Sequence, residues 1–289
     1  MRKDFWKILE TLNKAKTVIT LNTNATLITR PVAKKLSRFP IRPYTVSLDG
    51  SLPEIHDSLR GRGAFEKTIK GIKNLVSQKL PVLISTTVTR LNYKDLYDIA
   101  LLGKKLGVSK VRFNEVLCVG NAACFPRDLM LTADEKAGLL EIAEEIRNRF
   151  GKFATGTIFA GLEFIKKIKQ MPRENFPLKA RPCAAATTIC DIRPDGWVTP
   201  CGILWDVKAG NLKNESLYNI WHNSPVMKAF RKTIELKKED APECEGCKYL
   251  AACYKGHRCY PYYIPMPGII CKKLYYRNRL WTNRSRSQA

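Results

Sequence analysis

The chain has 289 residues, 45% of them hydrophobic, which is enough to bury the core of one large or two ordinary domains and excludes a disordered tail. Its 50 Lys and Arg residues outnumber 26 Asp and Glu residues, and the resulting formal charge of +24 allows an acidic partner without specifying one. No stretch resembles a membrane span or a secretory signal peptide, so we expect a cytoplasmic protein.

Helical and strand patterns alternate through the first half of the chain. Helical periodicity over residues 4–15 is followed by a short apolar strand at residues 17–21. Strands separated by helices of ten to fifteen residues imply parallel pairing with right-handed crossovers. We therefore predict an α/β domain over residues 1–175, either a β/α barrel or an open sheet. The further predicted helices cover 31–39, 63–77 and 93–106, and the further strands cover 44–48, 82–89 and 110–114.

The pattern changes in the second half of the chain. Thr132 and Glu135 predict a capping box at the start of a helix that runs to about residue 150. Three prolines in residues 171–182 indicate a domain boundary. Beyond it, Asp195-Gly196 predicts a hairpin turn between strands at 187–193 and 197–201. We expect a second domain over residues 176–272, with short helices at 216–221 and 225–236, and a basic tail over 273–289.

Eight of the ten cysteines fall in this second domain. A CxxC pair places two sulfurs on one metal centre, and longer gaps let distant loops complete the site, in zinc and iron-sulfur ligation alike. The spacing alone leaves both metals open, and disulfides are disfavoured in a cytoplasmic protein. Cys118 and Cys124 stand apart from the group. The eight candidate metal ligands are Cys183, Cys190, Cys201, Cys244, Cys247, Cys253, Cys259 and Cys271.

These spacings resemble the SPASM domain that follows the barrel of radical S-adenosylmethionine (radical SAM) enzymes, as do residues 193–201 (RPDGWVTPC) and 217–221 (LYNIW). One step departs, because five residues separate Cys253 from Cys259 where the family usually has three. The resemblance favours iron-sulfur over zinc and implies two interlocking auxiliary [4Fe-4S] clusters. It assigns Cys183, Cys190, Cys201 and Cys259 to one cluster and Cys244, Cys247, Cys253 and Cys271 to the other. His257 is expected to lie beside these ligands rather than among them.

The first domain resembles the barrel of the same family. Residues 23–27 (TNATL) are similar to its TNG strand end, with Ala25 in place of glycine, and residues 46–50 (VSLDG) are similar to its next strand end. Both segments end predicted parallel strands, where α/β sheets bind ligands. The resemblance implies that Ser47 and Arg60 contact S-adenosylmethionine (AdoMet). The alternative is that Asp49-Gly50 only ends a strand in a turn. No catalytic residue is predicted.

The CxxxCxxC motif that binds the radical-generating cluster of this family is absent from the sequence. We therefore expect a partial barrel that lacks its first strands, either because the start is internal or because a separate polypeptide supplies them. The predicted strand at 17–21 would then present an unpaired edge. AdoMet and a third [4Fe-4S] cluster are expected only if the missing part is supplied, and the chain alone should lack radical activity.

The resemblance implies a role in radical modification of a peptide or in maturation of a PQQ- or haem-type cofactor. The expected partners are a peptide or small-molecule substrate and an electron donor. Gly202 occupies the position where the sulfatase-maturing branch has an aspartate, which argues against that branch. The alternative is a non-catalytic cluster or zinc protein whose basic surface binds nucleic acid or another acidic partner.

Overall fold

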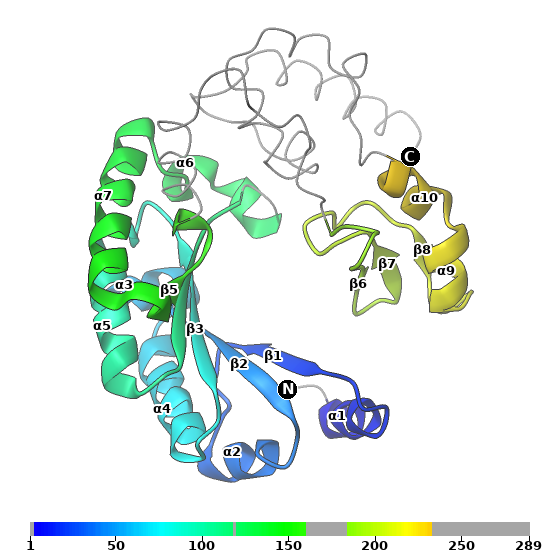
Figure 1. Ribbon diagram of the computed structural model, residues 1–289, viewed down its shortest axis with the longest axis horizontal. Coiled ribbons are helices and arrows are strands. Elements are labelled where there is room, and N and C mark those ends of the chain that lie inside the picture. Colours follow the sequence, from blue (N-terminus) through cyan, green and yellow to red (C-terminus); the bar gives the residue numbers. More distant parts are fainter. Residues whose placement is uncertain (1–2, 118–119, 160–183, 233–289) are drawn as a thin grey trace, which may run out of the picture. The chain divides into compact units, whose positions relative to one another are not determined.

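The computed structural model describes residues 3–117, 120–159 and 184–232 (Figure 1). The chain divides into two compact units, the first within Met1–Val116 and Phe125–Gln170 and the second within Leu117–Cys124 and Met171–Ala289. The boundary predicted at residues 171–182 lies outside the described residues and stays a prediction. The same holds for the cysteine-rich segment after residue 232 and for the tail at 273–289.

A five-stranded parallel sheet forms the centre of the first unit, which confirms the predicted α/β class. The strands lie side by side in chain order, with β1 at one edge, so the described residues leave the outer edge of that strand unpaired. The predicted strands are present, and the last strand was not predicted because two residues are too few for a pattern. The strands are β1 (Ile19–Thr23), β2 (Ile41–Ser47), β3 (Val82–Val88), β4 (Lys110–Glu115) and β5 (Ala154–Thr155).

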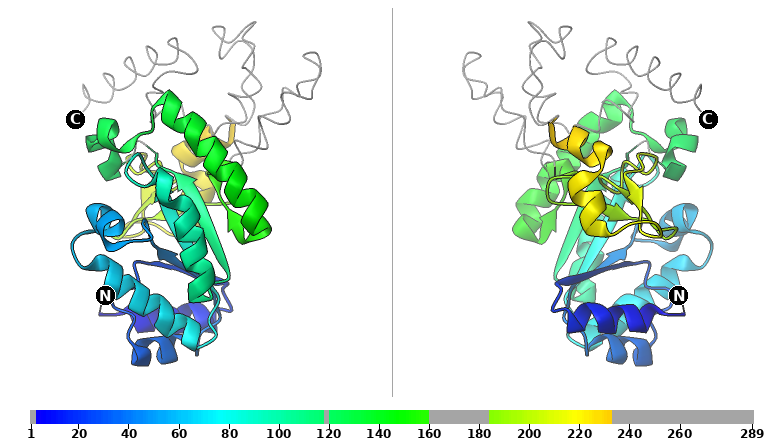
Figure 2. Two further views of the ribbon diagram at one scale, coloured as in Figure 1. Left: turned by 90° about the vertical axis from the view of Figure 1, so that its left-hand side faces the viewer. Right: turned by 90° about the vertical axis from the view of Figure 1, so that its right-hand side faces the viewer.

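Helices α3, α4, α5 and α7 lie on one face of this sheet, as Figure 1 and the left view of Figure 2 show. The short helices α3 and α6 were not predicted, and the helix expected at 93–106 begins with a 3-10 turn, Tyr93–Asp95. The helices are α1 (Phe5–Lys14), α2 (Arg30–Leu36), α3 (Pro53–Arg60), α4 (Ala64–Ser77), α5 (Leu96–Leu106), α6 (Pro126–Leu129) and α7 (Ala133–Phe150). Further 3-10 turns span Gly120–Cys124 and Gly151–Phe153.

The core lies between the sheet and these helices. Val46, Ile84, Val111 and Phe113 are fully buried on that side of the strands. Tyr44 is also fully buried; its hydroxyl donates to the Leu36 carbonyl at 3.1 Å, and burial raises the pKa of Tyr44 to about 12. The hydroxyl of Tyr44 therefore stays protonated and keeps its hydrogen bond within the apolar core.

The capping box predicted at Thr132 is present at the start of α7. The Thr132 hydroxyl accepts from the Glu135 N–H at 3.2 Å, and the Glu135 carboxylate accepts from the Thr132 N–H at 2.7 Å. Two N–H groups that the first turn would leave unpaired are thereby satisfied.

A close backbone contact joins the turn after β1 to helix α4. Ala25 adopts the left-handed conformation, with φ of 59°, and is 1% exposed. Glycine, expected here from the resemblance, would suit this conformation better than alanine. Gly71 of α4 faces the turn so closely that a Cβ at this position would lie 2.2 Å from the Ala25 carbonyl oxygen. The lack of a side chain at Gly71 thus sets how near α4 approaches the strand end.

The described part of the second unit holds a small antiparallel sheet and two short helices. The predicted hairpin is confirmed, with Gly196 at φ of 91° in its turn, although its strands are shorter than predicted. The strand β8 was not predicted, and the side chain of Ser216 caps α9 by accepting from the Asn219 N–H at 3.1 Å. The elements are β6 (Asp191–Ile192), β7 (Trp197–Thr199), β8 (Gly210–Asn211), α9 (Leu217–Asn223) and α10 (Pro225–Lys232).

Among the described residues, no helix combines the length and the apolar character that crossing a membrane requires.

Replacement of Gly71 by alanine should lower the free energy of unfolding by about 3 kcal/mol, because the new methyl group overlaps the Ala25 carbonyl and α4 must shift. Urea denaturation of the full chain, followed by circular dichroism, measures this. The matched control is Gly138→Ala in α7, where the nearest atom to a new Cβ is 3.9 Å away. That variant should gain up to about 1 kcal/mol from helix propensity. Equal effects of the two substitutions would contradict the close contact.

Candidate functional site

The carboxyl ends of β2 and β3 are joined by the buried side chain of Asp49, which is 2% exposed. One carboxylate oxygen accepts from the Thr87 N–H at 2.8 Å, and the other accepts from Arg60 Nε in an ion pair. A buried carboxylate is tolerated only when it is paired in this way. Asp49 therefore fixes the loop after β2 against β3 and against the last turn of α3.

Asn92 completes this link from the segment after β3. Its amide Nδ2 donates to the carbonyl oxygens of Asp49 at 2.9 Å and Thr87 at 3.0 Å. Its Oδ1 accepts from the Thr89 N–H at 2.7 Å and from the Thr89 hydroxyl at 3.2 Å. Asn92 is 1% exposed, and these bonds use the hydrogen-bonding capacity of its amide. The residue orients the strand ends and has no group left for a ligand.

His56 lies behind the same loop and is 1% exposed. Its Nδ1 accepts from the Asp49 N–H at 3.0 Å, so the neutral ring carries its proton on Nε2. Burial is the main cause that lowers the pKa of His56; the charge of Arg60 lowers it further, while Asp49 and Asp57 oppose the shift. Gly50 has no room for a side chain, since a Cβ would lie 2.5 Å from the backbone nitrogen of His56.

Asp57 caps helix α4 from the preceding helix. Its carboxylate accepts from the backbone N–H groups of Phe65, at 2.8 Å, and Gly63. The Phe65 N–H is the main cause of the lowered pKa of Asp57. The segment from His56 to Arg60, which resembles a family motif, thus holds the loop and two helix ends in place through its own side chains.

The two predicted AdoMet contacts lie near one another in the chain's fold. Ser47 is the last residue of β2 and is half-buried, and Arg60 reaches the end of the same strand through its ion pair with Asp49. The structure brings both to the carboxyl edge of the sheet, where parallel α/β sheets bind ligands. Their contact with AdoMet stays a prediction.

Polar residues on the open face of the sheet were missed by the sequence reasoning. Ser85, Thr87, Arg112 and Asn114 are half-buried or exposed, whereas the intervening residues face the helices and are buried. The alternation of polar and apolar residues in 82–88 and 110–115 was the available indication of a sheet with one polar face.

A second missed pair joins the loop after β2 to α5. Asp95 is 8% exposed and accepts from the Ser51 N–H at 2.6 Å and from the Ser51 hydroxyl. Burial raises the pKa of Asp95, although both bonds from Ser51 favour the charged form. The pair adds a further tie between the two strand ends.

Only Cys190 and Cys201, of the eight predicted metal ligands, lie within the described residues. The hairpin register pairs Asp191 with Thr199, so Cys190, just before β6, and Cys201, two residues after β7, lie at the same end of the hairpin. Both are free thiols; Cys201 is 7% exposed, and burial, with help from Asp191, raises the pKa of Cys190. Soft sulfur donors in an apolar setting fit an iron-sulfur centre. The remaining predicted ligands, Cys183, Cys244, Cys247, Cys253, Cys259 and Cys271, lie outside the described residues.

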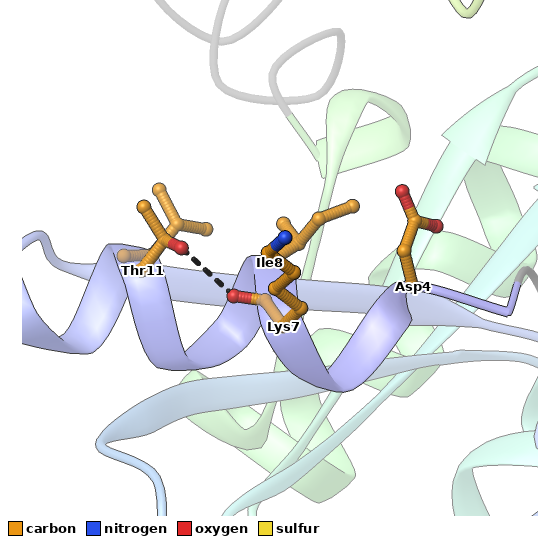
Figure 3. A pocket seen from close by; sticks show the side chains of 5 residues that line it. Asp4, Lys7, Ile8 and Thr11 are labelled. Atoms are coloured by element: carbon orange, nitrogen blue, oxygen red, sulfur yellow. Dashed lines mark hydrogen bonds between the residues drawn. The ribbon is translucent and has the colours of Figure 1, made fainter.

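Within the part of the chain that the structure describes, no group of three or more His, Cys, Asp or Glu residues could hold a metal ion. A surface hollow of about 350 Å³ lies along α1 (Figure 3). Its described lining comes from this one helix and its N-cap residue Asp4, and the Thr11 hydroxyl donates to the Lys7 carbonyl at 2.9 Å. Ligand sites gather polar groups from several elements, so this hollow does not have the character of one.

The burial of His56 predicts a pH-dependent stability. Because the folded pKa is lowered, the unfolded chain binds the proton more readily below about pH 6.5. The contribution of a neutral His56 is thus present above that pH and is lost as the pH falls. His56→Asn keeps an acceptor for the Asp49 N–H but does not titrate. Its urea unfolding midpoint should therefore change less than that of the native chain between about pH 7.5 and about pH 5.5, a window around the pKa of free histidine. His222→Asn, on the exposed side of α9, is the control; equal flattening by both variants would contradict the prediction.

Comparisons with known proteins agree with this geometry. Residues 1–103 match the model of the radical SAM superfamily, and residues 183–248 match the model of the SPASM iron-sulfur cluster-binding domain. An AdoMet-dependent heme synthase of Methanosarcina barkeri is 29% identical over 260 residues, which cover 87% of this chain and 72% of the relative. The mycofactocin maturase MftC of Mycobacterium tuberculosis is 26% identical over 271 residues, 92% of this chain and 66% of the relative. The chain thus spans about two thirds to three quarters of these relatives.

Solved structures show the same fold. Streptococcus suis SuiB bound to precursor peptide SuiA has a TM-score of 0.68 and 16% identity, over 94% of this chain and 62% of that chain. The enzyme anSMEcpe with bound AdoMet and Cp18Cys peptide has a TM-score of 0.65 and 18% identity, over 96% of this chain and 78% of that chain. At such identities the likeness shows the fold alone. With both family models matched in the expected order, the chain belongs to the radical SAM proteins that carry a SPASM iron-sulfur domain.

Proposed function

We propose that this chain acts in radical modification of a peptide or in maturation of a PQQ- or haem-type cofactor. The observation that supports this most is the hairpin that brings Cys190 and Cys201 to its same end, inside the match to the iron-sulfur domain. The related heme synthase and mycofactocin maturase point to the same two classes of reaction. The whole activity is a proposal, because the chain spans only part of these relatives.

The proposed ligand sets are interlocked. Cys183, Cys190, Cys201 and Cys259 hold one auxiliary [4Fe-4S] cluster, and Cys244, Cys247, Cys253 and Cys271 hold the other. Thiolate-bound cubane clusters supply low-potential, single-electron transfer. Cys201 packs against Ala185 and Leu204, so its sulfur would lie in an apolar setting with little water. Such a setting helps to set the reduction potential of a bound cluster.

The strand ends of the first unit are the proposed AdoMet site. Ser47 offers a half-buried hydroxyl at the carboxyl end of β2, and Asp49 holds the guanidinium of Arg60 near the same edge. These side chains bind and orient the cofactor in this proposal, while the buried network of Asp49, His56 and Asn92 keeps the loop rigid.

Iron content tests the cluster proposal. Protein purified without oxygen and reconstituted should be brown and hold about eight irons and eight sulfides per chain, as expected for two cubane clusters. Iron, zinc and acid-labile sulfide assays measure this. A colourless protein loaded with zinc, whose affinity for nucleic acid falls steeply with salt, would instead support a non-catalytic basic zinc protein.

The ligand assignment is tested at its one irregular spacing. Cys259→Ala should lower the iron content from about eight to about four per chain, because one cluster loses its last thiolate and the other keeps all its ligands. Cys124→Ala is the matched control, since Cys124 is an exposed thiol outside the array, and it should leave the iron content unchanged. Loss of both clusters, or of neither, in Cys259→Ala would overturn the assignment.

A further inference from the structure

The face of the parallel sheet opposite the helices is mostly polar. Along β2, β3 and β4, side chains that point to the helices are buried, and the polar side chains that alternate with them are half-buried or exposed; Leu83, which is 5% exposed, is the buried apolar exception on this face. In these strands the described residues of the first unit leave this open face uncovered. The side chains on it include Thr45, Ser47, Ser85, Thr87, Lys110, Arg112 and Asn114.

The strand register places Arg112 in a row of hydroxyl side chains. Ser47 pairs with Ser85, Ser85 pairs with Arg112, and Arg112 pairs with Thr155. Neighbouring strands are about 4.8 Å apart, so Ser85 and Thr155 flank the base of the arginine and Ser47 lies about 10 Å away. Lys110 is on the same face of β4, about 7 Å along the strand. The open face thus carries two cations next to hydroxyl groups.

Among the residues that the structure describes, acidic side chains do not balance these cations. Glu115 is the one acidic residue in the five strands, and it pairs instead with Lys136 of α7 at 2.8 Å, on the helix side. Asp49, just beyond β2, is taken up by Arg60. Among the described residues, the guanidinium of Arg112 has no hydrogen bond or ion pair, whereas Arg60, Arg90 and Arg193 each pair with a carboxylate.

We propose that Arg112, assisted by Lys110 and the Ser85 hydroxyl, binds a carboxylate of the substrate. A guanidinium offers two parallel N–H donors that match a carboxylate, and the Ser85 hydroxyl has no other partner among the described residues. This inference rests on the proposed function, since it names the substrate class of that site. It sets the bound carboxylate about 10 Å from Ser47, so the rest of the substrate can reach toward the proposed AdoMet site.

The test uses the full chain, reconstituted without oxygen, and coproporphyrin III as a fluorescent probe with propionate arms. Its methyl ester keeps the ring and removes the charges. The native chain should bind the free acid at least about ten-fold more tightly than the ester. Arg112→Gln should lose most of that preference, and Arg112→Lys should keep part of it, because charge remains without the paired donors. Arg149→Gln, on the exposed surface of α7, removes the same charge elsewhere and should behave as native.

Three results would overturn the inference. The first is that the native chain does not bind coproporphyrin III, or binds it no more tightly than the methyl ester. The second is an equal loss in Arg149→Gln, which would indicate net charge rather than a site. The third is displacement of the acid by saturating AdoMet in the native chain, which would assign the carboxylate to AdoMet. Unfolding midpoints control for folding of each variant. Iron content, measured on the same samples, separates failure of the proposed clusters from failure of this site.

Discussion

The carboxylate of Asp49 is the constraint on which the candidate site depends. A buried charge is costly, and here it is offset by the Thr87 N–H and by the guanidinium of Arg60. The backbone of the same residue bonds to His56 and Asn92. One side chain and its peptide groups thus hold the ends of β2 and β3 and the end of α3 in a fixed arrangement, and Ser47 lies two residues before it.

The one-sided sheet decides where chemistry can occur in the first unit. Parallel sheets usually bury both faces, but in the described part of the first unit helices cover one face, and the strands mostly alternate buried and polar residues. Tyr44, Val46 and Phe113 point into the core on the helix side, whereas the polar side chains that alternate with them do not belong to this core. The hydroxyls and the arginine on the open face therefore sit on rigid strands, which position groups more exactly than loops do.

In the second unit a short hairpin positions two of the predicted metal ligands. Its register brings Cys190 and Cys201 to the same end of the hairpin, where Cys201 belongs to the apolar cluster of Leu204 and Cys190 packs against the cluster of Val198. Cation–π contacts support the same unit, with Arg193 over Trp205, Lys208 over Trp197 and Arg231 over Trp221. Such a small domain has little core of its own, and metal ligation commonly stabilises domains of this kind.

The sequence by itself determined the local structure and the family motifs. Periodicity placed the main helices and strands, the Thr132 and Glu135 pair placed a capping box, Asp195-Gly196 placed a hairpin, and cysteine spacing together with short motifs pointed to the family. The tertiary structure alone decided that His56 and Asp57 act within the scaffold, that Arg60 pairs with Asp49, and that Ser47, Ser85, Arg112 and Thr155 form one row. The reason is physical: a pattern along the chain fixes which face a residue takes, whereas strand register and helix approach fix which distant residues it meets.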